Sequence, residues 1–219
     1  MKGILTIVQK EWRCFLGSDR GIFLLYIVLM LSWSIMLANP GESAAQAGQI
    51  WFIFFSVVIS ANFSNTVFIA ERVNGILEIL LTSGLSRKQI LFGKMLFVAG
   101  MSCIIGIICM LVSNIWRHLL FTDGMQTLSA MDVIVYCCAV LMNTASGAYF
   151  SVKMGNPRLL HLLNLLVLGG IIILHSVAVS FFTVPTVALP LLLLVLTAGC
   201  TMLALRLYES EKILQPVLF

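Results

Sequence analysis

Long apolar runs alternate with short polar segments along the whole chain. A helix needs about 20 mainly apolar residues to cross the hydrocarbon core of a bilayer, and runs of about this length recur along the sequence. The predicted spans are residues 21–37, 50–70, 90–116, 132–152, 159–182 and 186–205. We therefore expect an all-α membrane protein in which residues 1–219 form one transmembrane domain.

The first 17 residues follow a different pattern. At about 100° per residue, one helical face carries Ile4, Leu5, Val8, Trp12, Phe15 and Leu16. The opposite face carries Lys2, Thr6, Gln9, Lys10 and Arg13, whereas Ile7 and Glu11 fall near the edges. This pattern predicts an amphipathic helix over residues 1–17 that lies in the membrane interface. A helix packed on the protein's own cytoplasmic face would show the same pattern.

The segment between the second and third spans is too apolar for a disordered loop and too charged for lipid. One helical stripe is formed by Ile76, Leu77, Leu80 and Leu81. Ser83 and Gly84 are expected to end this helix, and Ser86 to cap the third span. The pattern predicts a short cytoplasmic helix over residues 71–83 that is rigidly joined to the bundle.

Polar side chains inside the predicted spans are the candidates for lining a translocation path. They are Ser56, Ser60, Asn62, Asn65, Asn143 and Ser146. Polar residues in spans usually face other helices or a cavity, so packing between helices is the alternative. His161 and His175 fall in the fifth span, where a hydrogen-bonding role and a ligand role are both open.

The placement of basic residues sets the expected orientation. With six spans and both termini in the cytoplasm, Arg117 alone of the 13 lysines and arginines lies outside. An odd number of spans would place Arg206 and Lys212 outside as well. The charge pattern thus predicts six spans with both ends inside.

Composition narrows the functional classes. The 219 residues are 60% hydrophobic and 10% charged, against about 25% charged in a soluble domain. The basic residues lie between apolar runs, so no nucleic-acid partner is expected. The six cysteines lack metal-ligand spacing, and Gly93-Lys94 lacks the remaining glycine and the Ser or Thr of a nucleotide-binding loop. We expect no cofactor in this chain and no enzymatic activity of its own, so driven transport would draw its energy from another subunit.

The polar segment resembles the type-2 permease family of ATP-binding-cassette (ABC) transporters. The matching residues are Glu71-Arg72, Gly75, Leu77-Glu78, Leu80-Leu81, Ser86-Arg87 and Gly93-Lys94. Ile76 stands where threonine is common in the family, and Gly84 where proline is common. The tail from Arg206 to Leu214 also resembles the family's ending, and larger members carry a hairpin between the last two spans that is nearly absent here.

The resemblance implies a permease that pairs with a second copy or a paralogue and docks on two cytoplasmic ABC ATPase subunits, which bind ATP and Mg²⁺. It implies that coupling to the ATPase involves Glu71, Arg72, Gly75, Leu77 and Glu78. The expected location is the bacterial inner membrane and the expected direction is export. Two alternatives stay open: a permease subunit like that of the haem exporter of cytochrome c maturation, and a membrane assembly subunit that transports nothing. An ion-coupled carrier or a membrane enzyme ranks third.

Overall fold

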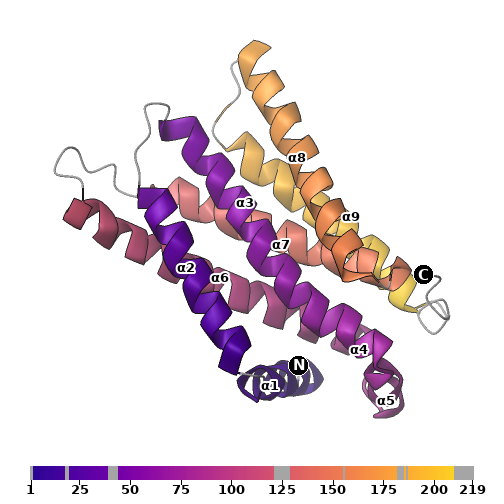
Figure 1. Ribbon diagram of the computed structural model, residues 1–219. Helices are drawn as coiled ribbons and strands as arrows, with labels where there is room; N and C mark the ends of the chain where they lie inside the picture. Colours follow the sequence, from indigo (N-terminus) through magenta and orange to yellow (C-terminus); the bar gives the residue numbers. More distant parts are fainter. Residues whose placement is uncertain are drawn as a thin grey trace.

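The computed structural model describes residues 2–17, 20–38, 44–120, 129–154, 156–181, 185 and 187–209, and the secondary structure within these ranges is helical (Figure 1). The chain forms α1 (Lys2–Leu16), α2 (Arg20–Ala38), α3 (Ala44–Ser64), the π-helical turn η1 (Asn65–Ile69), α4 (Ala70–Val73), α5 (Ile76–Thr82), α6 (Arg87–Leu120), α7 (Ala130–Lys153), α8 (Pro157–Phe181) and α9 (Ala188–Glu209). The all-α prediction is confirmed.

Five helical segments of the described chain are long and apolar enough to cross a membrane, which makes the protein a multi-pass membrane protein by length and composition. They are Trp51–Arg72, Arg87–Leu119, Ala130–Lys153, Arg158–His175 and Ala188–Tyr208. Helix α2 contributes the shorter apolar stretch Tyr26–Ala38. The predicted first span therefore coincides with a helix, whereas its crossing of the bilayer stays a prediction.

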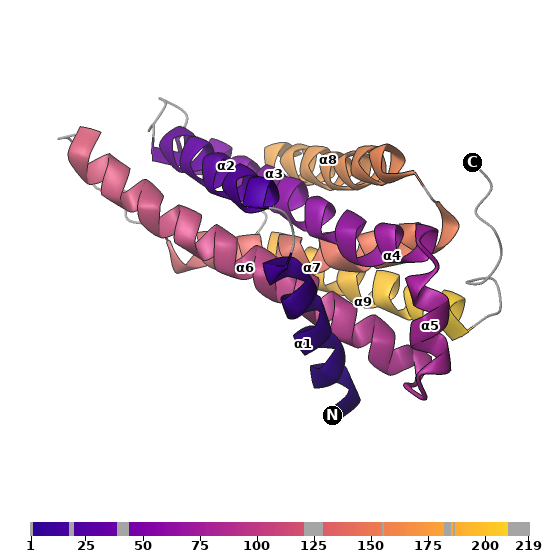
Figure 2. The same cartoon turned by 60° about the horizontal axis from the view of Figure 1, so that its bottom comes forward.

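Helix α7 occupies the centre of the bundle and packs against α3, α6, α8 and α9 (Figures 1 and 2). Its contact surface carries small buried residues, among them Ala139, Ala145 and Ala148. Small side chains let helix backbones approach closely where no hydrophobic effect drives helices together. Helices α1 and α2 both pack on α6, and α1, α4 and α5 lie at the same end of the bundle.

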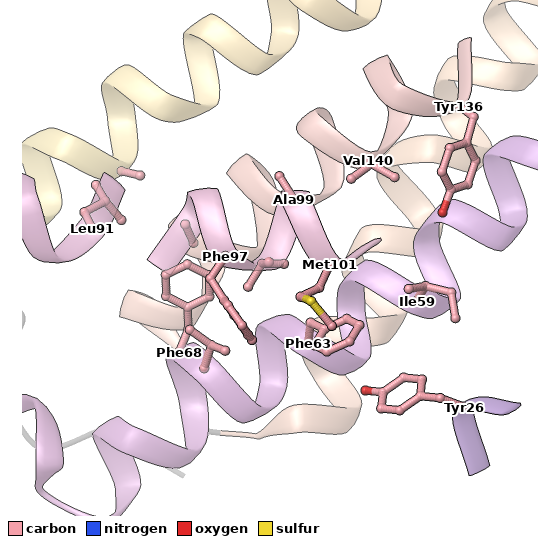
Figure 3. Close-up of a cluster of buried hydrophobic side chains, with 14 of the residues drawn as sticks. Tyr26, Ile59, Phe63, Phe68, Leu91, Phe97, Ala99, Met101, Tyr136 and Val140 are labelled. Atoms are coloured by element: carbon pink, nitrogen blue, oxygen red, sulfur yellow. The ribbon is translucent and has the colours of Figure 1, made fainter. Parts of the chain in front are cut away.

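A buried apolar cluster runs through the bundle and joins α2, α3, α6 and α7 (Figure 3). The rings of Tyr26 and Phe63 stack with centroids 4.9 Å apart, and Phe97 meets Phe63 edge-on at 6.2 Å. Aromatic pairs in these geometries add to the packing of helices. The cluster fixes the position of the C-terminal half of α3, which continues into η1 and α4.

The short cytoplasmic helix begins later than the sequence pattern indicated. Gly75 adopts a left-handed conformation (φ 72°) that separates α4 from α5. Glu71 and Arg72 therefore belong to the end of the long α3–η1–α4 helix, and only Ile76–Thr82 forms the separate helix. Its predicted end is confirmed, because α5 stops before Ser83 and Gly84 turns left-handed (φ 77°).

The predicted cap at Ser86, before the third apolar run, is also confirmed. The backbone N–H of Gln89 donates to Ser86 Oγ (3.3 Å), and Ser86 N–H donates to Gln89 Oε1 (3.1 Å). This reciprocal pair is a capping box, which satisfies two backbone donors at the start of α6. The turn from α5 to α6 is thereby held by local hydrogen bonds.

Candidate functional site

A wide helical turn sets the direction in which Glu71 points. In a regular α-helix, Glu71 would lie on the same face as Ser64, which precedes it by two turns. The π-helical turn Asn65–Ile69 intervenes and adds residues to one turn of the helix. Ser64 lies close to Gly147 of α7, whereas Glu71 reaches Lys10 of α1 and Lys94 of α6. The wide turn thus lets one continuous helix present its polar groups in two directions.

Glu71 is the centre of a buried ion network that we call the ion joint, made of Lys10, Glu11, Glu71 and Lys94. One carboxylate oxygen of Glu71 accepts from the ammonium of Lys10, and the other accepts from the ammonium of Lys94. Lys10 also pairs with Glu11 (Nζ–Oε1 3.0 Å), and Lys94 donates to the carbonyl of Val67 (2.7 Å). Three helical segments, α1, α4 and α6, are therefore tied by charges.

Burial of three of the four charges makes the partners of the ion joint depend on one another, whereas Lys10 is half-buried. Lys94 is fully buried, and Glu71 and Glu11 are also buried. Removing water from a charge costs several kcal/mol, and close opposite charges and hydrogen bonds must offset that cost. With two lysines and two glutamates, the network is neutral as a whole. The arrangement therefore stands as a unit, and the loss of one member would strand another.

Arg72 extends the connection to a fourth helix. Its guanidinium donates to the carbonyls of Ser151 (2.8 Å) and Val152 at the C-terminal end of α7. The last carbonyls of a helix have no partner within the helix, and a cation there is also favoured by the helix dipole. Arg72 thus caps the central helix of the bundle. Together, Glu71 and Arg72 connect α4, which precedes α5, to α1, α6 and α7.

Helix α1 packs on α6 through Ile7 and Glu11, which the sequence pattern placed at the border between the apolar and polar faces. Ile7 and Glu11 are buried, not peripheral, and Gly93 of α6 provides the space for this contact. A Cβ at Gly93 would lie 2.6 Å from Ile7 Cβ, so only glycine permits the observed approach. The apolar face was predicted as a single surface, but the structure divides it between protein contact and the exposed strip Leu5, Trp12 and Leu16.

Helix α5 is anchored on one side and open on the other. Leu77 is buried, and Leu80 and Leu81 pack partly buried against the core. Glu78 is exposed, and Ile79 exposes 69% of its surface. Of the five residues predicted to couple to an ATPase, Glu71, Arg72 and Leu77 face the bundle. Glu78 lies on the surface, and Gly75 forms the bend.

Four of the six predicted path residues gather in a neutral polar layer between α3, α7 and α8. We define this polar layer by its buried side chains, Ser56, Ser60, Ser64, Asn143, Ser146 and Asn164. Asn143 Nδ2 donates to Ser56 Oγ (3.0 Å), and Ser146 Oγ donates to Asn164 Oδ1 (2.8 Å). These bonds cross between helices of one chain, which favours the packing role. Lining of a path stays a prediction.

The other two predicted path residues are half-buried. Asn62 Nδ2 donates to the carbonyl of Val58 on its own helix (2.9 Å). Asn65 shares a hydrogen bond of 2.6 Å with Nε2 of His161 on α8. Of the two roles that the sequence left open for His161, the structure therefore shows the interhelical hydrogen bond. His175 lies half-buried farther along α8.

Sequence reasoning did not identify Lys10, Glu11 and Lys94 as members of the site. Each stands in the sequence as an ordinary charged residue, Lys10 and Glu11 near the middle of α1, and only the packing of the helices brings them to Glu71. Asn164 was also missed, although an asparagine inside an apolar span is a usable signal. Among the described residues, no group of three or more His, Cys, Asp or Glu side chains is placed to hold a metal ion.

Comparison with known proteins gives no family assignment. No family model matches the sequence, and no curated protein matches it.

Proposed function

We propose that the chain is the membrane-spanning permease subunit of an ATP-driven exporter of the type-2 ABC class, with its energy supplied by separate ATPase subunits. The observation that carries the proposal is the ion joint beside α5. A short helix with an exposed isoleucine and glutamate projects from a point where buried charges tie α1, α4 and α6 together. A cytoplasmic partner that moved α5 would move these elements as one body.

The arrangement of the helices supports six spans with both termini in the cytoplasm. The helices α2, α3, α6, α7, α8 and α9 alternate in direction along the chain (Figure 1). Arg87 at the start of α6 donates to the carbonyl of Tyr208 near the end of α9 (3.5 Å). Arg117 reaches the carbonyl of Leu37 at the other end of α6 (2.8 Å). Under the positive-inside rule, the end with α1 and α5 is cytoplasmic, as expected in a bacterial inner membrane.

In the proposed cycle, two copies of the permease, or one copy and a paralogue, dock on two ATPase subunits. ATP and Mg²⁺ bind to the ATPases alone. Ile79 and Glu78 provide the contact, Leu77 anchors α5 to the bundle, and Glu71 and Arg72 pass the motion to α1, α6 and α7. Packed cores shift between discrete arrangements and do not deform continuously. Movement of α5 would therefore tilt one permease copy relative to the other.

Co-purification tests this proposal. The tagged chain is extracted from its native membranes in mild detergent, and ATP hydrolysis is assayed in the eluate. We expect a nucleotide-binding subunit to elute with the chain and to hydrolyse ATP. A chain that elutes alone and inert under these conditions would contradict the proposal and favour the assembly subunit.

A pair of charge reversals tests whether the ATPase subunit contacts the chain at α5. Glu78→Arg is expected to reduce the co-eluting ATPase at least about tenfold, because a reversed charge at an interface costs several kcal/mol. Lys153→Glu, on the exposed C-terminal end of α7, is the control and should retain the partner. Equal loss in both variants would indicate a general effect of charge and not a contact at α5.

A further inference from the structure

A cavity of about 230 Å³ lies between α1, α2, α6 and the α3–α4 helix, beside the ion joint. Its wall includes Phe15, Tyr26, Phe63 and Phe97, together with Glu11 and Glu71. Its rim includes Cys14, Thr66 and Asn74, which are exposed. The cavity therefore opens between the N-terminal helix and the turn that leads to α5.

The apolar part of the cavity is built from aromatic rings that hold one another in place. Phe15 lies 6.2 Å from Tyr26 and 5.6 Å from Phe63, measured between ring centroids. Phe63 in turn lies between Tyr26 and Phe97 (Figure 3). Aromatic walls of this kind suit an apolar chain or ring, and their faces also attract a cation.

The charged lining residues of the cavity are acidic. Among its described lining residues these are Glu11 and Glu71, while their partners Lys10 and Lys94 are not part of the lining. Both oxygens of Glu71 are held by these lysines. Glu11 pairs with Lys10 through Oε1, so its carboxylate is the better placed of the two to meet a further donor.

We propose that this cavity binds a cationic amphiphile, with its ammonium beside Glu11 and its apolar part among Phe15, Tyr26 and Phe63. Carboxylates and aromatic faces both favour positive charge, and together they would discriminate against neutral and anionic molecules of equal length. The site lies within one chain and needs no ATPase partner. It therefore goes beyond the proposed function and can be tested apart from it.

The exposed thiol of Cys14 at the rim provides a direct probe. The other five cysteines are buried or half-buried. The full chain is placed in lipid nanodiscs and alkylated with a neutral maleimide, and Cys14→Ser gives the background from the other thiols. Decyltrimethylammonium, decanol and decyl sulfate are compared at equal concentration in the bilayer. We expect saturable, several-fold slower alkylation with the cationic probe and little change with the other two.

Two variants separate the charge from the rings. Glu11→Gln should raise the half-protecting concentration of decyltrimethylammonium at least about tenfold, while Lys10 keeps its pair with Glu71. Tyr26→Leu should weaken protection by the cation several-fold and leave the weak effect of decanol unchanged. Lys153→Gln, which removes an exposed charge outside the cavity, is the control and should bind as the wild type does.

Equal protection by all three probes would overturn the proposal, because it would report partitioning into the bilayer. No protection, or protection that is unchanged in Glu11→Gln, would overturn it as well. Charge-selective binding in a chain that recruits no ATPase would support the site and contradict the proposed transporter. Recruitment of an ATPase without charge-selective binding would do the reverse.

Discussion

The ion joint and the polar layer lie on the same long helix, yet they satisfy buried polar groups in different ways. The ion joint uses full charges, and both carboxylate oxygens of Glu71 have lysine partners. The polar layer uses amides and hydroxyls, and Ser64 Oγ, Asn143 Oδ1 and Asn164 Nδ2 are buried without a protein hydrogen-bond partner. The two regions are separated by the π-helical turn of residues 65–69.

This difference indicates that the helices tied by the ion joint move as one body. A buried charge network loses several kcal/mol when one partner departs, so its members stay together. Neutral hydrogen bonds between membrane helices average about 0.6 kcal/mol, because separated groups find other partners. We therefore expect α1, α4 and α6 to hold together at the ion joint, and α8 to separate from α3 and α7 more easily at the polar layer.

The largest expected effect is at Lys94. Lys94→Met should lower the free energy of unfolding by about 3 kcal/mol, because it leaves part of the Glu71 charge buried without compensation. Thermal unfolding in detergent measures it. Lys153→Met removes an exposed lysine of α7 and should change the free energy by less than about 1 kcal/mol. If Lys94→Met were as mild as this control, the ion joint would not hold the helices together.

A pair of glycine substitutions compares helix contacts at the two regions. Gly93→Ala would place a Cβ 2.6 Å from Ile7 Cβ, whereas Gly147→Ala would place one 2.8 Å from Ser64 Oγ, a hydroxyl at the tip of a short side chain that can change rotamer. We expect about 1–3 kcal/mol for Gly93→Ala and less for Gly147→Ala. Gly93→Ala should also speed alkylation of Cys14 as α1 detaches. The opposite order would place the tighter contact in the polar layer.

The smallest effect is expected at Asn143. Asn143→Leu should change the free energy of unfolding by less than about 1 kcal/mol, because the amide gives one bond to Ser56 and its oxygen has no partner. Transport assays on the same variant then decide between packing and path lining. Normal stability with lost transport would favour path lining, while normal values of both would favour packing.

The sequence predicted the helices well, because long apolar runs and turn residues act locally. Helices were expected near all six apolar runs, and Ser86 was correctly assigned as a cap. The start of α5 at Ile76 was missed because the pattern does not reveal that Gly75 is left-handed. The buried face of α1 was misplaced because Glu11 reads as polar, whereas its pairing with Lys10 lets it enter the contact face. The ion joint required the π-helical turn, for which the sequence carries no simple signal.

Photo-crosslinking from Ile79 tests whether α5 is the contact for an ATPase subunit. A photoreactive amino acid is introduced at position 79 of α5 and, as a control, at position 104, where an exposed isoleucine of α6 lies within an apolar span. Cells are illuminated and the adducts are identified. We expect an adduct with an ATP-hydrolysing cytoplasmic protein from position 79 and none from position 104. If position 79 gave no protein adduct, or gave the same adducts as position 104, the proposed contact at α5 would be contradicted.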